Sequence, residues 1–294
     1  MMIWAKVKTA SLAAAAALCA TAGIGASVAG DGPAKAVGAT PRPMLETAAV
    51  PEAVRAEVET MTDAIPQEPP KAAADLVGHW TFDEADGEKV EDASGQGHAG
   101  TFQGSVKRGD GKLGKALVFD GSGGHVEIFK TTVLDAVHQN SYTVAAWFKP
   151  ENLPPGTEDA NDATYGIVLR SGWHLGIAYN GEGKFIMTHW TAPETWAGAG
   201  SWEDTYPPGR WHHVAGVVDR PAGTVKIYVN GEEKGTGEFA AGAEPKAYET
   251  SWKIGIGGPG AEKWAWPAKG AIDDVRLYRK ALTADEVKAL FEGK

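Results

Sequence analysis

The sequence has little cysteine, no excess of positive charge and no long run of bulky apolar residues. Its 294 residues contain one cysteine, which excludes an internal disulfide bond and any metal site built from several cysteines. Acidic residues outnumber basic ones by 38 to 28, which argues against nucleic acid and anionic membrane surfaces as partners. This acidity is compatible with divalent cations and neutral glycans, or it serves to keep an exported protein soluble.

Catalytic motifs with a fixed spacing are also missing. The eight histidines show no H-x-x-x-H or H-E-x-x-H spacing, and His212 and His213 would face opposite sides of a strand. No G-x-S-x-G occurs, and GIGG at 255–258 is not followed by a helix pattern. A zinc site, a serine hydrolase and a phosphate-binding loop therefore have no support.

The first 29 residues predict a secretory signal peptide. Lys6 and Lys8 form a basic start, and the small apolar run from 10 to 29 ends near two candidate cleavage positions, Ala26 and Ala29. The alternative, a retained membrane anchor, would require bulkier apolar residues. We therefore expect a secreted protein, extracellular or periplasmic, without membrane insertion once the signal is removed.

Residues 30–75 differ in composition from the rest of the chain. They are rich in Ala, Pro and Glu and contain no aromatic residue. Residues 51–65 have the apolar spacing of one short helix, which would be marginal alone. We expect a disordered linker here.

From Leu76 onward, short alternating segments separated by Gly, Asn and Pro predict an all-β domain that spans 76–294. We expect 115–121 and 125–129 to pair as a hairpin and 191–209 to contain no strand. A helix is expected at 282–293, where Thr283 and Glu286 form a capping box. Further strands are expected at 76–82, 141–150, 211–220, 224–235, 251–258 and 269–278, with three shorter ones between 165 and 190.

Six segments resemble one known family in their order along the chain. They are WTFDEADGEKVEDASGQGHAGT, GKALVFDGSGGHVEI, YTVAAWFKP, RWHHVAGVVDRPAGTVKIYVNGE, WKIGIGG and GAIDDVRLYRKALTADEVKAL. The domain resembles the laminin-G-like jelly rolls of the concanavalin A-like lectin/glucanase superfamily. The resemblance implies a two-sheet antiparallel jelly-roll sandwich with a short C-terminal helix. It does not by itself imply a ligand.

The closing strand suggests a buried acid. Ala271, Asp273, Val275 and Leu277 share one face in simple alternation, so we expect Asp273 to point inward, where a carboxylate needs a partner.

The family resemblance implies a structural calcium site for that acid. The early Asp-Gly loop and the closing strand select Asp92 and Asp273 as ligands, with the backbone carbonyls of Gly97 and His98 as weaker candidates. The alternative is that backbone N–H groups satisfy Asp273 and that Asp92 is a turn residue.

Aromatic residues in irregular segments are the main candidates for ligand binding. Together with nearby acids they could stack on sugar rings, bind a protein surface, or simply cover the sandwich. These candidates are Trp190, Trp196, Trp202, Tyr206, Trp264 and Trp266.

Three classes of function remain open. We favour a non-catalytic binding module that recognises a glycan or a cell-surface protein. A glycoside hydrolase would need a carboxylate pair, and the one E-x-D-x-E triplet, Glu84, Asp86 and Glu88, falls in an expected loop. The third class is a structural surface or adhesion protein without a small ligand.

Overall fold

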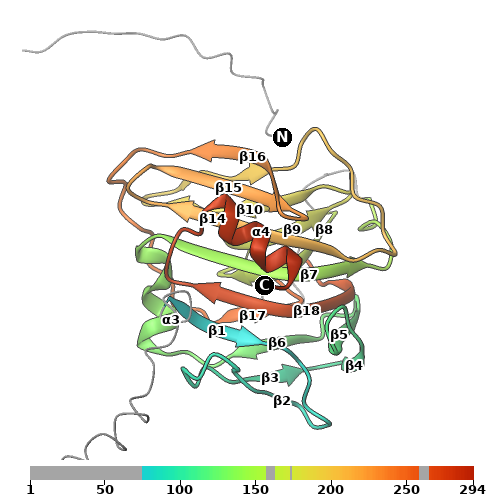
Figure 1. Ribbon diagram of the computed structural model, residues 1–294. Helices are drawn as coiled ribbons and strands as arrows, with labels where there is room; N and C mark the ends of the chain where they lie inside the picture. The colour runs from blue at the N-terminus through green and yellow to red at the C-terminus, as the bar shows by residue number, and fades with distance from the viewer. Residues whose placement is uncertain (1–74, 157–162, 173, 258–264) are drawn as a thin grey trace, which may run out of the picture. The chain divides into compact units, whose positions relative to one another are not determined.

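Two antiparallel sheets of eight strands each pack face to face in the computed structural model (Figure 1). The structure describes residues 75–156, 163–172, 174–257 and 265–294. The arrangement confirms the predicted jelly-roll sandwich. The expected signal peptide and almost all of the expected linker lie outside the described residues. Within the described ranges, no helix is long and apolar enough to cross a bilayer.

Sheet A has the strand order β16-β15-β14-β7-β18-β5-β4, and β1 pairs with β18. Its strands are β1 (Leu76–Trp80), β4 (Val106–Asp110), β5 (Lys115–Asp120), β7 (Tyr142–Pro150), β14 (His212–Asp219), β15 (Thr224–Val229), β16 (Glu232–Glu238) and β18 (Lys269–Tyr278).

Sheet B has the order β13-β10-β9-β8-β17-β6-β3-β2, and β11 and β12 form a separate hairpin. These strands are β2 (Lys89–Val90), β3 (Gly100–Gln103), β6 (His125–Ile128), β8 (Thr164–Arg170), β9 (Leu175–Asn180), β10 (Phe185–Thr188), β11 (Trp190–Thr191), β12 (Thr195–Trp196), β13 (Ala199–Gly200) and β17 (Trp252–Ile254). Our prediction of no strand in 191–209 is therefore wrong for its first half, because short strand pairs form there.

The core lies between the two sheets and is built from alternate residues of each strand. Phe148 of β7 and Tyr179 of β9 meet across it with ring centres 5.8 Å apart, and both are fully buried. Each large apolar side chain buried in this way contributes about 1.5–3 kcal/mol to folding. This core holds the sheets rigidly enough to position the loops at their edges.

The expected hairpin of 115–121 and 125–129 does not exist. Strand β5 pairs with β4 and β18 in sheet A, whereas β6 pairs with β3 and β17 in sheet B. The glycine-rich turn at 121–124 carries the chain from one sheet to the other. Turn residues mark where a chain reverses, but they do not specify which sheet the next strand joins.

The closing strand pairs with the first strand as expected, with Leu76 opposite Tyr278. A β-bulge interrupts β18 between Asp273 and Arg276, and Asp274 takes a left-handed φ of 48°. The bulge shifts the alternation, so Ile272 faces the core before it and Val275 faces the core after it.

Our prediction that Asp273 points into the core is therefore wrong. The residue is fully buried, but on the outer face of sheet A, next to Trp147 on β7. Trp147 in turn contacts Phe291 of the C-terminal helix, with ring centres 5.7 Å apart.

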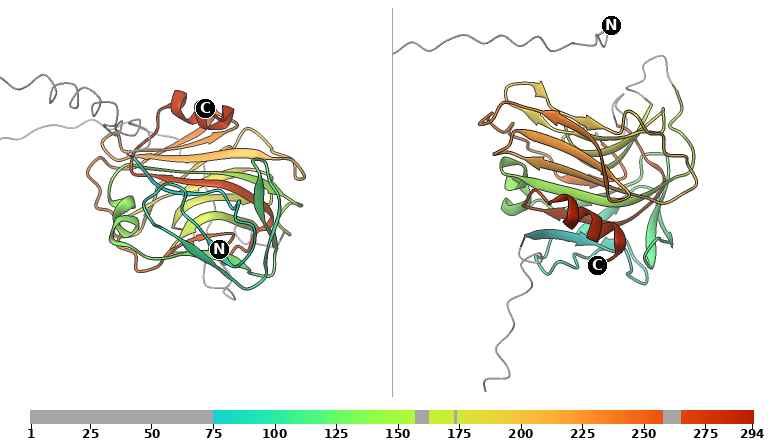
Figure 2. Two further views of the ribbon diagram at one scale, coloured as in Figure 1. Left: turned by 60° about the horizontal axis from the view of Figure 1, so that its bottom comes forward. Right: turned by 45° about the horizontal axis from the view of Figure 1, so that its top comes forward.

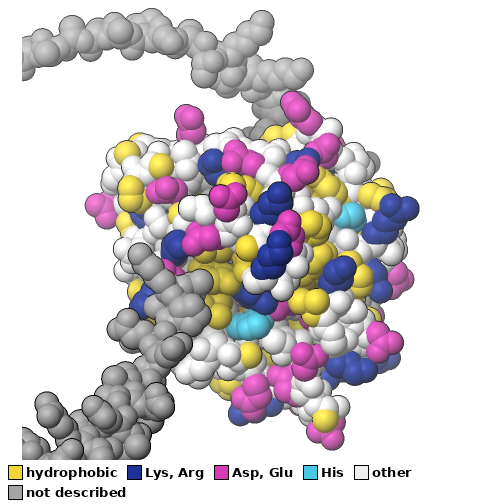
Figure 3. All heavy atoms as spheres, in the orientation of Figure 1, with side chains coloured by type: hydrophobic (Ala, Val, Ile, Leu, Met, Phe, Trp, Pro, Cys, Tyr) yellow, Lys and Arg dark blue, Asp and Glu magenta, His cyan; other side chains and the backbone are white. Residues whose placement is uncertain are grey.

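Helix α4 (Ala284–Glu292) lies across this outer face (Figures 1 and 2). Thr283 and Glu286 form the predicted capping box, and Gly293 ends the helix with a φ of 72°. Val287 is fully buried against sheet A. Around the helix, acidic and basic side chains are interspersed with apolar ones, so the face shown in Figure 3 has no extended patch of one charge.

The remaining helical elements are short. Helix α3 (Thr132–Ala136) runs directly into the 3-10 turn η2 (Val137–Gln139), and both lie between β6 and β7. Arg170 on β8 is fully buried and anchors this segment by donating to the carbonyl oxygens of Leu134 and Asp135 at 3.1 and 3.0 Å.

Candidate functional site

Two of the predicted tryptophans face each other on the small hairpin that follows β10. Trp190 on β11 and Trp196 on β12 are directly opposite in register, so their side chains share one face. The ring of His174 meets Trp190 edge-on at 5.1 Å between centres. Sequence analysis did not single out His174, because its place beside the hairpin depends on tertiary packing.

Glycines in and directly before edge strand β13 leave room for two indoles against the backbone. A Cβ atom at Gly198 would overlap the Trp196 indole, and one at Gly200 would overlap the Trp202 indole. Ala197 and Ala199, which alternate with these glycines, point into the core, so both indoles lie on the outer face of sheet B. Gly198 and Gly200 are about 7 Å apart, the span of two residues along a strand.

Trp202 is the most exposed of these tryptophans, with 47% of its surface accessible, and Trp196 is half-buried. One side of each indole therefore packs against the backbone, and the other side faces outward. We call Trp190, Trp196 and Trp202 the tryptophan platform.

A loop of residues 242–248 braces the hairpin. Thr191 forms a bridge with Pro245, and the amide of Ala192 donates to the Glu244 carbonyl at 2.9 Å. Lys246 pairs with Glu194 at 2.5 Å, and its hydrogen bond lowers the pKa of that exposed carboxyl. The hairpin is thus held at both its strand and its turn.

The structure separates Tyr206 from the platform. Its side chain is buried, with the ring 5.3 Å from Phe185 and 5.4 Å from His212, and its carbonyl accepts from the Tyr179 hydroxyl at 2.7 Å. This environment raises the pKa of Tyr206 to about 12, mainly through burial. Tyr206 packs on the sandwich and is not displayed for a ligand.

Trp266 is also packed. It is buried and clusters with Leu169 and Ala178 on the outer face of sheet B. Trp264, the last of the predicted aromatic residues, lies outside the described residues.

Asp92 organises the loop that was predicted to bind calcium. Its Oδ1 accepts from the amides of His79 and Ser94, and its Oδ2 accepts from the amide of His98, each at 2.9 Å. Burial tends to raise the pKa of Asp92, but the hydrogen bonds from Ser94, His98 and His79 outweigh it and lower that pKa. The His98 carbonyl accepts from the Trp80 indole at 2.8 Å, and Gly97 supplies a turn with φ 79°.

Asp273 makes a different set of contacts. Its Oδ2 accepts from the amides of Lys112 and Leu113 at 2.8 Å each, whereas its Oδ1 is buried and has no hydrogen bond from the described residues. Burial raises the pKa of Asp273 to about 6, and the neighbouring Asp274 adds to the effect.

The two acids therefore accept hydrogen bonds from separate loops. In the part of the chain that the structure describes, no group of three or more His, Cys, Asp or Glu residues could hold a metal ion. A Ca²⁺ ion requires six to eight oxygen ligands, so backbone carbonyls would have to complete any site at Asp92 or Asp273. Backbone N–H groups satisfy both oxygens of Asp92 but only Oδ2 of Asp273, and calcium binding stays a prediction.

The acid triplet considered for catalysis lies in a loop, as expected from its composition. Glu84 accepts from the amide of Glu91 at 2.6 Å and pairs with Arg108 at 3.1 Å. Its carboxylate thus ties two segments together, which gives it a structural role.

Several solved structures are similar to this domain. Domain 4 of AbnA, a GH43 extracellular arabinanase from Geobacillus stearothermophilus solved in complex with arabinotriose, is 28% identical with a TM-score of 0.53. The match covers 74% of this chain and 98% of that domain.

Two toxin binding domains share the fold at lower identity. They are the binding domain of Paraclostridial Mosquitocidal Protein 1 (16% identity, TM-score 0.56) and that of botulinum neurotoxin serotype D (15%, TM-score 0.57). Each match covers 76% of this chain and about half of the toxin domain, 53% and 52% respectively.

No curated protein matches the chain. A family model, Laminin_G_3, matches residues 120–288, which is more than half of the sequence and includes the platform and the closing strand. The chain therefore belongs to the concanavalin A-like lectin/glucanases superfamily.

Proposed function

We propose that the domain is a non-catalytic glycan-binding module and that the tryptophan platform stacks on sugar rings. The observation that carries this proposal is the placement of Trp196 and Trp202 against Gly198 and Gly200 at edge strand β13, with Trp202 exposed. Indoles held in this way lose little conformational freedom when a ligand binds. The apolar faces of sugars bury aromatic surface, and polar groups at the rim then orient the sugar hydroxyls.

Two further observations support the proposal. The Glu194–Lys246 ion pair sits beside the platform and offers both hydrogen-bond donors and acceptors to a ligand. The arabinanase domain, which this chain resembles over almost the whole length of that domain, was solved with a bound arabino-oligosaccharide. An exported protein, as the N-terminal sequence leads us to expect, would meet such glycans outside the cell.

A hydrolase is the weaker hypothesis. Retaining or inverting hydrolysis needs two carboxyl groups about 5–9 Å apart across a scissile bond. The triplet that suggested this chemistry contributes Glu84 to an ion pair with Arg108 instead.

The test is a binding titration of the protein with arabinotriose and with a panel of other neutral oligosaccharides. We expect Trp196→Ala and Trp202→Ala each to weaken binding of the recognised sugar about tenfold, because each removes one stacked ring. Trp211→Ala is the matched control, since Trp211 is a half-buried indole that stacks on Lys149 away from the platform.

Unchanged affinity in both platform variants would overturn the assignment of the site. Binding of a cell-surface protein, with no binding of any sugar in the panel, would favour the protein partner that the same aromatic residues could also serve.

A further inference from the structure

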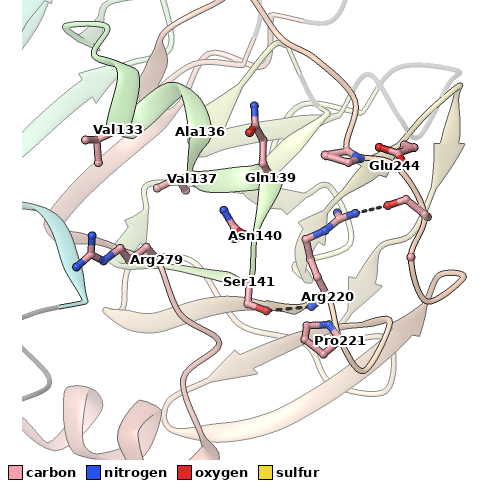
Figure 4. A pocket seen from close by; sticks show the side chains of 13 residues that line it. Val133, Ala136, Val137, Gln139, Asn140, Ser141, Arg220, Pro221, Glu244 and Arg279 are labelled. Atoms are coloured by element: carbon pink, nitrogen blue, oxygen red, sulfur yellow. Dashed lines mark hydrogen bonds between the residues drawn. The ribbon is translucent and has the colours of Figure 1, made fainter. Parts of the chain in front are cut away.

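A cleft of about 810 Å³ opens beside the loop that braces the platform hairpin. Its walls come from α3 and η2, from the turn after β14, and from residues 242–245 (Figure 4). Residues 244 and 245 of this loop also contact the hairpin, so one loop separates the cleft from the tryptophan platform.

The guanidinium group of Arg220 lies in the wall of this cleft (Figure 4). Its Nη2 donates to the Ala243 carbonyl, and its Cζ lies 5.6 Å from the centre of the Phe239 ring. Its Nη1 is buried and donates no hydrogen bond to the described residues. Burial lowers the pKa of Arg220, which indicates that its surroundings do not fully compensate its charge.

Other arginines that are shielded from solvent are each paired with a carboxylate. These pairs are Arg170 with Asp135 at 2.9 Å, Arg108 with Glu84 at 3.1 Å, and Arg276 with Asp274 at 3.1 Å. Arg220 has no such ion pair within the described residues: its contacts are a backbone carbonyl and an aromatic ring. The Glu244 carboxylate attracts Arg220 without forming an ion pair, and burial outweighs this attraction. A partly buried guanidinium without a paired counter-ion is costly, and its planar fork matches a carboxylate.

We propose that the cleft binds the carboxylate of an acidic sugar, a uronate, and that Arg220 supplies the counter-charge. The inference rests on the proposed glycan-binding function and specifies its ligand. Asn140 and Arg279 lie in the same cleft and add an amide donor and a second guanidinium, which also lies 3.9 Å from the Asp75 carboxylate. Glu244 is the acidic residue of the lining, so basic side chains outnumber acidic ones there although the whole protein is acidic. A glycan that contacts both the platform and the cleft would have to cross loop 242–248.

The direct test is an NMR titration of the ¹⁵N-labelled protein, monitored at the arginine Nε–Hε signals. The probes are sodium galacturonate and sodium glucuronate, with galactose and glucose as their neutral counterparts. We expect the Arg220 signal to shift with both uronates and to stay in place with the neutral sugars. The exposed Arg210 serves as the internal control. No shift of Arg220 with either uronate at millimolar concentration would overturn the proposal.

A second experiment compares tri-galacturonate with its carboxyl-reduced form, which differs only in the charged group. We expect the wild-type protein to prefer the acid form at least about fivefold at low salt, and the preference to shrink in 0.5 M NaCl because salt screens the attraction. Arg220→Gln should abolish the preference, Arg220→Lys should retain part of it, and the control Arg210→Gln should leave it intact. A preference that survives in Arg220→Gln would also contradict the proposal.

The failures of the two proposals can be distinguished. The platform is tested by the affinity of neutral oligosaccharides for the tryptophan variants. The cleft is tested by the difference between acid and neutral forms in the arginine variants. If neutral sugars bind through the platform but no uronate preference exists, the cleft proposal fails and the glycan-binding function stands.

Discussion

Three neighbouring residues on the outer face of sheet A each bury a polar atom that forms no hydrogen bond with the described residues. The atoms are Nε1 of Trp147, Nδ1 of His213 and Oδ1 of Asp273. Trp147 is paired in register with both of the others, so the three side chains lie side by side. Burial lowers the pKa of His213 to about 4, which leaves its ring neutral at pH 7. Ionised Asp273 therefore has no positive imidazolium beside it.

This environment makes the stability of the protein depend on Asp273 and pH. The pKa of Asp273 rises from 3.8 to about 6 on folding, so the folded state favours the protonated acid. The contribution of the protonated Asp273 carboxyl to the free energy of unfolding is complete below about pH 4 and is lost as the pH rises through about 6. In EDTA at pH 8, we expect Asp273→Asn to be more stable than wild type by up to about 3 kcal/mol. Below pH 4 the difference should vanish.

Urea unfolding at pH 4 and pH 8 measures this effect. Asp110→Asn, which neutralises an exposed acid, is the control and should change little at either pH. Destabilisation by Asp273→Asn at pH 8 in EDTA would show that the ionised carboxylate is well compensated after all.

At the scale of elements, α4 shows how local signals and packing combine. The Thr283 hydroxyl accepts from the Glu286 amide at 3.3 Å, and the Glu286 carboxylate accepts from the Thr283 amide at 2.9 Å. The capping box begins the helix at a defined residue, and the buried Val287 together with Phe291 attaches it to sheet A. The helix covers Trp147 and its neighbours on the outer face.

Removing the cap should weaken the domain by a modest amount. We expect Thr283→Ala to lower the free energy of unfolding by about 1 kcal/mol, because the first helical turn loses a hydrogen-bond acceptor. Thr283→Ser keeps the hydroxyl and should retain most of the stability. Chemical denaturation of the three proteins measures the difference, and equal stability of the Ala and Ser variants would rule out the cap as the cause.

At the scale of the molecule, the two ends of the domain meet where β1 pairs with β18. The sequence suggested that Ca²⁺ also joins these ends through Asp92 and Asp273. If so, adding Ca²⁺ to EDTA-treated protein raises the melting temperature, by the equivalent of about 2.7 kcal/mol at a hundred times the Kd. Asp92→Asn should abolish that rise. No change with Ca²⁺, together with no bound metal in the purified protein, would remove the calcium hypothesis and leave both acids as acceptors of backbone hydrogen bonds.

The sequence alone determined the features that depend on residues close together along the chain. The turn at Asn230–Gly231 joins β15 and β16 as predicted, since both residues take the positive φ angles that such a tight turn requires. The capping box and the strands with clear alternation were correct for the same reason. The predicted tryptophans Trp190 and Trp196 lie opposite each other on one hairpin, because they are close in sequence.

Only the tertiary structure decided which strands pair and which way the irregular residues face. Strand β6 joins the sheet opposite to β5, and the bulge at Asp273 turns that acid to the outer face of sheet A. The cleft around Arg220 gathers residues from four segments that are far apart in the sequence. Strand pairing and cleft formation depend on contacts between residues far apart in the chain, and no local pattern of side chains encodes them.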